Sequence, residues 1–421
     1  MPCRSASDCC RETSDPLYKH WPFFLSRRSD SGAVCGLYYD TLAECTFDFG
    51  QEHDNYHGFY RSVEIADGDL DGFVFAGPGL PAALARFVAA IGGTALPPRW
   101  SLGYANTAMA LADHPDAQDR IAAFLARAVA ERFPLSSFHF GSGYTSRGQQ
   151  RYVFTWNTDK FPDPAGLLRA FAAAGVRTVA NLKPCLLDDH PAYAALAGQG
   201  AFVREPGPAD GAGKPCLGQF WDGWGAHLDF SRPLDRQWWQ AQLQATVLDP
   251  GFDAGWNDNN EYVIWGEQAL ALGFGQALPL PRSRPLQALL MTRATFDQQA
   301  PARPDERVYT VTRAGPPGIQ RYAQTWTGDN SSSWHTLRWN QRMALTMALS
   351  GLFNTGHDIG GFYGPVPDAE LLVRWAQACC LLPRMIMNSW KADGSVNSPW
   401  LHAEATAPIR AAIGLRLRLL P

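Results

Sequence analysis

From Arg99 onward, short apolar segments alternate with segments whose apolar residues recur every three to four positions, a pattern that predicts alternating strands and helices. Strands are expected near Ser101–Tyr104, Ser137–Phe140, Arg177–Leu182, Phe252–Trp256, Val308–Thr312, Ala323–Thr325, Leu352–Asn354 and Met385–Met387. Helical patterns separate them, at Asp119–Phe133, Pro164–Ala174, Gln237–Leu248, Leu286–Gln299, Arg338–Ser350 and Ala369–Cys380, and a last one follows at Ala407–Leu420. Eight such alternations over about 320 residues favour an α/β fold, a (β/α)8 TIM barrel with its site at the carboxyl ends of the strands.

A doubly wound parallel sheet is the competing architecture. Its dinucleotide-binding turn would have to be Gly141-Ser-Gly143. That segment lacks the third glycine of the usual pattern and leads into polar residues, not a helix. The barrel is therefore the better interpretation.

Residues 1–98 have a different pattern. The short apolar runs Ala33–Tyr39, Val63–Ala66 and Gly72–Phe75 are flanked by turn residues and predict β structure. A helix is expected at Pro81–Ile91, and Pro97-Pro98 is a plausible boundary. We therefore expect an N-terminal β region at 1–98 and a barrel at 99–421.

Charge and composition exclude several classes of protein. The net charge is -4, from 36 basic and 40 acidic side chains, which gives no reason to expect nucleic acid or an anionic membrane as partner. No apolar run approaches the ~20 residues that span a bilayer. The N-terminus lacks an apolar signal region, and the nine cysteines show no Cys-x-x-Cys spacing, so we expect a cytoplasmic protein with reduced thiols and no metal. The oligomeric state stays open.

Carboxylates follow several of the predicted strands. Asp258 comes directly after the fourth strand, Asp329 lies in the loop after the sixth, and Asp358 follows the seventh. In a barrel these ends meet at one mouth. Two carboxylates facing each other there, among tryptophans, are what glycoside hydrolysis requires, one as nucleophile or base and one as acid.

The same segments resemble glycoside hydrolase family 31, the retaining α-glycosidases. Trp256-Asn-Asp-Asn-Asn-Glu261 is similar to the family's W-x-D-x-N-E signature, and Trp326-Thr-Gly-Asp329 to its W-x-G-D loop. The resemblance implies that Asp258 is the nucleophile and Asp329 the general acid/base. Further matches are the R-x-x-x-x-G-x-Q-R-Y stretch beginning at Arg313, the G-x-D-x-x-G-F segment at Gly356–Phe362, F-P-D-P at Phe161–Pro164, and P-P-x-W-x-L-G-Y at Pro97–Tyr104. The resemblance extends over nearly the whole chain from about Asp15.

The resemblance also implies a substrate site. Substrate contacts are implied for Arg313, Trp256, Trp326, Glu261, Asp358, Asn388 and Trp221, the last in a Phe220-Trp-Asp-Gly223 segment that aligns with a family W-P-G. Arg313 could instead pair structurally with Glu261 or Asp358, and Trp221 could serve packing alone. The implied function is a retaining, α-glucosidase-like hydrolase that cleaves terminal α-linked sugars by double displacement, with a carbohydrate substrate and no cofactor.

Three departures leave alternatives open. Gly141 stands where the family has the Asp that holds the sugar's distal hydroxyls, and Asn388 stands where it has a substrate-binding His. An α-galactosidase or an α-N-acetylgalactosaminidase is therefore an alternative to an α-glucosidase. The N-terminal β region resembles only the last part of the family's β-sandwich, and the family's C-terminal β domains are not found after the barrel. An inactive, truncated sugar-binding homologue is thus a further alternative.

Overall fold

The computed structural model describes residues 18–207, 213–220, 222–264 and 268–420. Its centre is a curled parallel sheet with the strand order β19-β16-β12-β9-β8-β21-β20. The strands are β8 (Tyr104–Asn106), β9 (Leu135–Phe140), β12 (Arg177–Leu182), β16 (Ala254–Asn257), β19 (Thr310–Thr312), β20 (Gly356–Ile359) and β21 (Arg384–Met387). Every neighbouring pair in this sheet is parallel. Six of the eight predicted strands overlap strands of this sheet, although β8 lies at Tyr104–Asn106 and meets the predicted Ser101–Tyr104 only at Tyr104.

The segment 323–327 lies between the two outer strands, β19 and β20. On one side, the N–H of Gln324 donates to the carbonyl of Thr310 and the N–H of Thr312 donates to the carbonyl of Gln324, both at 2.9 Å. On the other side, the N–H of Thr325 donates to Asn354 and that of Thr327 to Gly356, both at 3.1 Å. The predicted sixth strand is thus not a regular strand, yet its backbone bonds to both neighbours.

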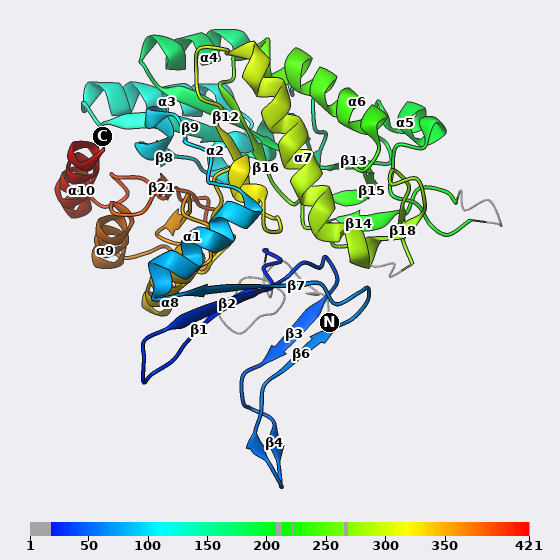
Figure 1. Ribbon diagram of the computed structural model, residues 1–421. Helices are drawn as coiled ribbons and strands as arrows, with labels where there is room; N and C mark the ends of the chain where they lie inside the picture. Colours follow the sequence, from blue (N-terminus) through cyan, green and yellow to red (C-terminus); the bar gives the residue numbers. More distant parts are fainter. Residues whose placement is uncertain (1–17, 208–212, 221, 265–267, 421) are drawn as a thin grey trace.

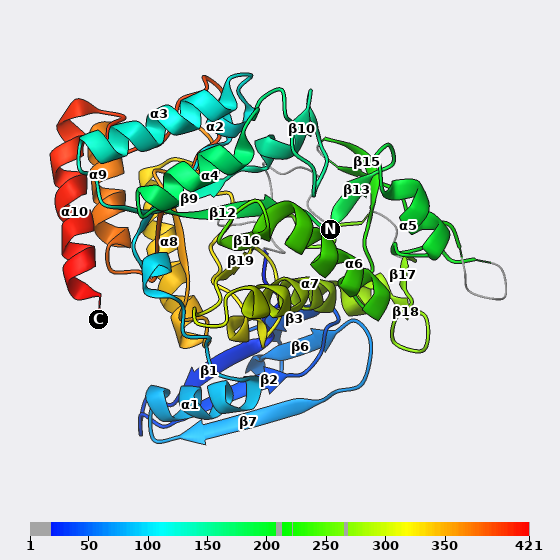
Figure 2. The same ribbon diagram turned by 90° about the horizontal axis from the view of Figure 1, so that it is seen from above.

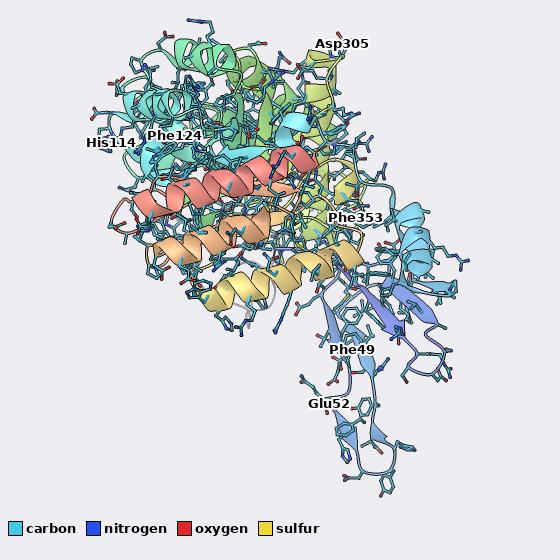
Figure 3. The ribbon with its side chains drawn as sticks, turned by 90° about the vertical axis from the view of Figure 1, so that its left-hand side faces the viewer. Phe49, Glu52, His114, Phe124, Asp305 and Phe353 are labelled. Atoms are coloured by element: carbon cyan, nitrogen blue, oxygen red, sulfur yellow. The ribbon has the colours of Figure 1, made fainter. Side chains whose placement is uncertain are left out.

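The prediction of a seventh strand at Leu352–Asn354 is wrong, because the strand is β20, at Gly356–Ile359. Phe353 is 41% exposed, whereas the polar His357 and Asp358 of β20 are fully buried. The apolar pair Leu352–Phe353, whose Phe353 is labelled in Figure 3, therefore has the pattern of a strand without forming one, whereas β20 itself carries buried polar side chains.

Helices surround the sheet, as Figure 2 shows from above. They are α2 (Met109–Asp113), α3 (Ala117–Ala130), α4 (Pro164–Ala173), α5 (Tyr193–Gln199), α6 (Pro233–Leu243), α7 (Leu280–Ala302), α8 (Trp334–Leu349), α9 (Ala369–Cys379) and α10 (Thr406–Leu419). Helix α3 buries Ile121, Phe124 and Leu125, which recur at helical spacing. Helix α4 begins at Pro164, and the Asp163 side chain accepts the N–H of Gly166 as its N-cap.

A small antiparallel sheet inserted after β12 was not predicted from the sequence. It has the order β13-β15-β14 and comprises β13 (Cys185–Leu187), β14 (Gly218–Phe220) and β15 (Gly223–His227). Short pairs elsewhere in the loops are β10 (Ser146–Arg147) with β11 (Gln150–Arg151), and β17 (Leu270–Ala271) with β18 (Leu278–Pro279). The turn between β14 and β15 carries Asp222 toward the end of β12.

The N-terminal region is rich in sheet, as predicted, and lies against one side of the curled parallel sheet and its helices (Figure 1). An antiparallel sheet joins β1 (Phe23–Arg27), β2 (Val34–Tyr39) and β7 (Gly72–Gly77), while β3 (Cys45–Asp48) pairs with β6 (Ser62–Ile65) and β4 (His53–Asp54) with β5 (Gly58–Phe59). Helix α1 (Leu80–Ile91) covers one face, where Phe87 stacks on Phe23 at 3.7 Å between ring centroids. On β1, Phe24 packs against Phe47 and Phe49 instead. Among the described residues, no helix is both long and apolar enough to cross a membrane.

Candidate active site

Asp258 is held at the carboxyl end of β16, where the sequence predicted it. All four residues of β16 are buried between β12 and β19, and the N–H of Asp258 continues the ladder by donating to the carbonyl of Leu182 at 2.9 Å. The next residue, Asn259, has a φ of +51°, a backbone conformation that Asn tolerates better than most residues. The chain therefore turns sharply just after the carboxylate, which is only 9% exposed.

Three cationic or amide groups contact the Asp258 carboxylate. Asn181 and Lys183 donate to its Oδ2 at 3.1 and 3.0 Å, and Arg313 Nη1 lies 3.2 Å from Oδ1. Burial raises the pKa of Asp258, but the charges of Arg313 and Lys183 outweigh it and hold the pKa well below its usual range. Asp258 is therefore ionised, as a nucleophile must be.

Asp329 lies in the loop that follows the 323–327 segment, and its pKa is shifted in the opposite direction to that of Asp258. Burial is the main cause that raises the pKa of Asp329 to about 6; the neighbouring charges of Asp258 and Glu261 raise it as well, while Arg313 lowers it. One carboxyl group with a raised pKa next to one with a lowered pKa is the pattern expected of an acid and a nucleophile.

Arg313, directly after β19, joins these carboxylates. Its Nε and Nη2 bind both oxygens of Glu261, at 2.5 and 2.9 Å, which fixes the plane of the guanidinium. Its Nη1 lies 3.2 Å from Asp258 Oδ1 and 3.1 Å from Asp329 Oδ2. Of the two structural partners that the sequence left open, the structure gives Glu261, and Arg313 reaches both predicted catalytic carboxylates besides.

The shared Nη1 limits the distance between the two carboxylates. The Asp258 Oδ1 and Asp329 Oδ2 atoms can be at most about 6 Å apart, because each lies within 3.2 Å of the same nitrogen. The two carboxylates therefore share one site, as glycoside hydrolysis requires.

The N-terminal region contributes two residues that the sequence analysis missed. The Tyr18 ring centroid lies 4.7 Å from Arg313 Cζ, and its hydroxyl accepts the N–H of Asp329 at 3.4 Å. Gly328 has a φ of +87°, and a Cβ there would lie 1.7 Å from the Tyr18 ring. The loop that carries Asp329 therefore requires glycine at position 328. Lys19 donates to the carbonyl of Trp326, and burial lowers its pKa to about 7. Tyr18 and Asp329 are 311 positions apart, so local sequence patterns could not have joined them.

Trp256 and Trp326, which the sequence predicted as substrate contacts, are buried and pack against each other. Trp256 and Trp326 are 4% and 1% exposed, and their rings meet edge to face at 5.6 Å. Arg384 Cζ lies 5.5 Å from the Trp326 ring. Trp221 lies outside the described residues.

Asp358 and Asn388 are paired at the ends of β20 and β21. Asn388 donates to Asp358 Oδ2 at 2.8 Å, and burial raises the pKa of Asp358 to about 7. Asp358 Oδ1 is buried and has no hydrogen-bond partner among the described residues. One oxygen thus pairs with Asn388, and the other makes no hydrogen bond within the described part of the chain.

Sequence profiles identify the family. The glycosyl hydrolases family 31 TIM-barrel domain matches residues 94–421, and the glycosyl hydrolase 31 N-terminal galactose mutarotase-like domain matches residues 6–48. The chain belongs to glycosyl hydrolase family 31. The resemblance inferred from the motifs around Asp258 and Asp329 is therefore confirmed.

Named relatives are α-glucosidases. Alpha-glucosidase 2 of Bacillus thermoamyloliquefaciens is 28% identical over 415 residues, which are 97% of this chain and 50% of the relative. The alpha-glucosidase of Saccharolobus solfataricus is 26% identical over 98% of this chain and 61% of its own length. This chain thus spans about half to three fifths of the length of these two relatives.

Solved structures share the fold. The glucosidase II alpha subunit, in a Glc1Man2-bound form, superposes with a TM-score of 0.84 at 25% identity, over 96% of this chain and 44% of that one. A family 31 dextranase of Flavobacterium johnsoniae complexed with glucose has a TM-score of 0.85 at 22% identity, over 98% of this chain and 50% of that one. The second likeness shows the fold alone.

Proposed function

We propose that this chain is a retaining α-glycoside hydrolase, α-glucosidase-like, that removes terminal α-linked sugars by double displacement. The observation that carries the proposal is the single Arg313 Nη1 that contacts two carboxylates, Asp258 and Asp329, whose pKa values are shifted in opposite directions. Family membership and the α-glucosidase names of the relatives support it.

In the first step, Asp258 attacks the anomeric carbon while protonated Asp329 donates its proton to the departing glycosidic oxygen. A covalent β-linked glycosyl-enzyme results. In the second step, ionised Asp329 takes a proton from water, which attacks the same carbon and releases the sugar with its configuration retained.

The charges of the site help Asp329 to change roles. The ionised Asp258 is one cause of the raised pKa of Asp329. When Asp258 becomes an ester, that negative charge disappears, and Arg313 is left to lower the pKa of Asp329. Asp329 therefore becomes a better base at the stage when the mechanism needs one.

We also propose a closed eight-stranded barrel and a division of the chain into two domains. We take the segment 323–327 as the one strand that completes a (β/α)8 barrel, the sixth in chain order, since it bonds to β19 and to residues 354 and 356. We take residues 1–98 and 99–421 as two domains, with Tyr18 and Lys19 of the first completing the site of the second.

A panel of 4-nitrophenyl glycosides tests the function. We expect release of nitrophenol from at least one of the α-glucoside, the α-galactoside and the α-N-acetylgalactosaminide, because the site has both carboxylates in place. The β-anomers serve as controls and should be hydrolysed at least about a hundredfold more slowly, since attack by Asp258 from the opposite face would be misaligned. A folded protein that hydrolyses none of the three α-glycosides would contradict the proposal.

A further inference from the structure

A polar pocket opens beside Asp258, on the side of β9 and β12. Its cavity volume is about 10 Å³, enough for one hydroxyl group or one water molecule, and its lining includes Ser142, Arg151, Asn181, Lys183 and Asp222. Asn181 and Lys183 line this pocket and also donate to Asp258. The pocket therefore shares two side chains, Asn181 and Lys183, with the surroundings of the proposed nucleophile.

Three lining side chains have buried polar atoms without a hydrogen-bond partner among the described residues. These atoms are Asp222 Oδ1, Asn181 Oδ1 and Ser142 Oγ. Asp222 is only 9% exposed, and its other oxygen accepts the N–H of Arg151 at 3.0 Å, which fixes the carboxylate. Buried polar atoms are costly when unpaired, so such a cluster marks a place for a polar ligand.

The charges of the lining favour neutral groups over anions. Arg151 Nη2 is paired with Asp113 Oδ1 at 2.6 Å, and Lys183 Nζ with Asp258 Oδ2 at 3.0 Å. Each cation thus already has a carboxylate, and Asp222 adds a further acceptor. A lining of this kind suits hydroxyl groups, which can donate to Asp222 and Asn181 and accept from Lys183.

The sequence explains why a carboxylate is needed here. Gly141, just before Ser142, stands where family members have the Asp that holds the distal hydroxyls of the sugar. A side chain at 141 would meet Met109, whose Sδ lies 3.1 Å from the position of a Cβ. Asp222 stands where the family's W-P-G segment has proline. Position 141 thus carries no carboxylate, whereas Asp222 provides one in the turn between β14 and β15.

We propose that Asp222, together with Asn181 and Ser142, binds a distal hydroxyl group of the terminal sugar and so determines specificity for neutral hexosides. The inference rests on the proposed function, because it places the terminal sugar against Asp258. It assigns to Asp222 the hydroxyl-binding role that Gly141 cannot perform.

Sugar binding, measured by calorimetry or by ligand-observed NMR, tests this inference without turnover. The probes are D-glucose, D-galactose, their common 4-deoxy analogue and their 6-deoxy analogues. The wild type should bind its preferred parent sugar at least about tenfold more tightly than one of the deoxy analogues. Asp222→Asn should weaken the parent by a similar factor and leave that analogue nearly unchanged, because the contact is already missing there.

Asp188→Asn is the matched control, because Asp188 is an exposed acidic residue near the pocket that does not line it. It should bind all probes like the wild type, and thermal melting should show that both variants are folded. An equal loss on parent and analogue in Asp222→Asn, tighter binding of D-glucuronate than of D-glucose, or no sugar binding by the wild type would overturn the inference. If the binding pattern holds but no α-glycoside is hydrolysed, the proposed function fails and the inference stands.

Discussion

Asp258→Asn should lower kcat/KM for an activated aryl α-glycoside by at least about 10³-fold, because the amide cannot form the glycosyl ester. Asn keeps the shape of the side chain beside Asn181, Lys183 and Arg313, all of which contact Asp258. It removes the charge, so two buried cations each lose a partner, and the melting temperature must be measured together with the rate. A variant that keeps a tenth of the wild-type activity would show that Asp258 is not the nucleophile.

Asp253→Asn is the matched control for that experiment. Asp253 immediately precedes the same strand, β16, and pairs with Arg177 and Arg303, each at 2.7 Å. Ion pairs at the amino end of a barrel strand serve stability rather than chemistry, because the site lies at the opposite end. We expect a lower melting temperature and an almost unchanged kcat for the folded fraction.

Asp329→Ala should separate substrates by their leaving group. The dinitrophenolate group of a dinitrophenyl glycoside leaves without protonation, so this substrate should still form the intermediate. A disaccharide such as maltose should be hydrolysed about 10²–10⁴-fold more slowly, because that is the usual contribution of a general acid. In the wild type, kcat/KM for the disaccharide should fall as the pH rises above about 6, where Asp329 loses its proton, and the variant should lack this fall. Equal losses on both substrates would exclude the acid/base role.

Asp258 and Asp329 could be predicted from the sequence because the site of a barrel lies at the carboxyl ends of its strands. Both follow apolar segments of the alternating pattern, and their flanking motifs gave them roles. Lys183 obeys the same rule, since it directly follows β12, and a cation after that apolar strand was a signal that the sequence analysis did not use.

Other parts of the site depend on interactions that no local pattern encodes. Tyr18 and Lys19, which lie near the start of the chain, contact Asp329 and Trp326 in the loop that carries Asp329. β20 was misplaced because its buried His357 and Asp358 are polar: Trp375 donates to His357 at 2.7 Å and Asn388 to Asp358 at 2.8 Å. Polar residues usually indicate exposure in a sequence, and the hydrogen bonds that permit the burial of these two come from residues distant in sequence.

In the proposed mechanism, Asp258 becomes covalently bound to the sugar. A 5-fluoro-α-glycosyl fluoride, in the sugar configuration that the aryl glycoside panel favours, should trap this intermediate because it slows the second step. Peptide mass spectrometry of the trapped protein should then find one glycosyl group, on the peptide that contains Asp258 and at that residue. A label on Asp329, or no label together with an inverted product in the NMR spectrum of the reaction, would contradict the account.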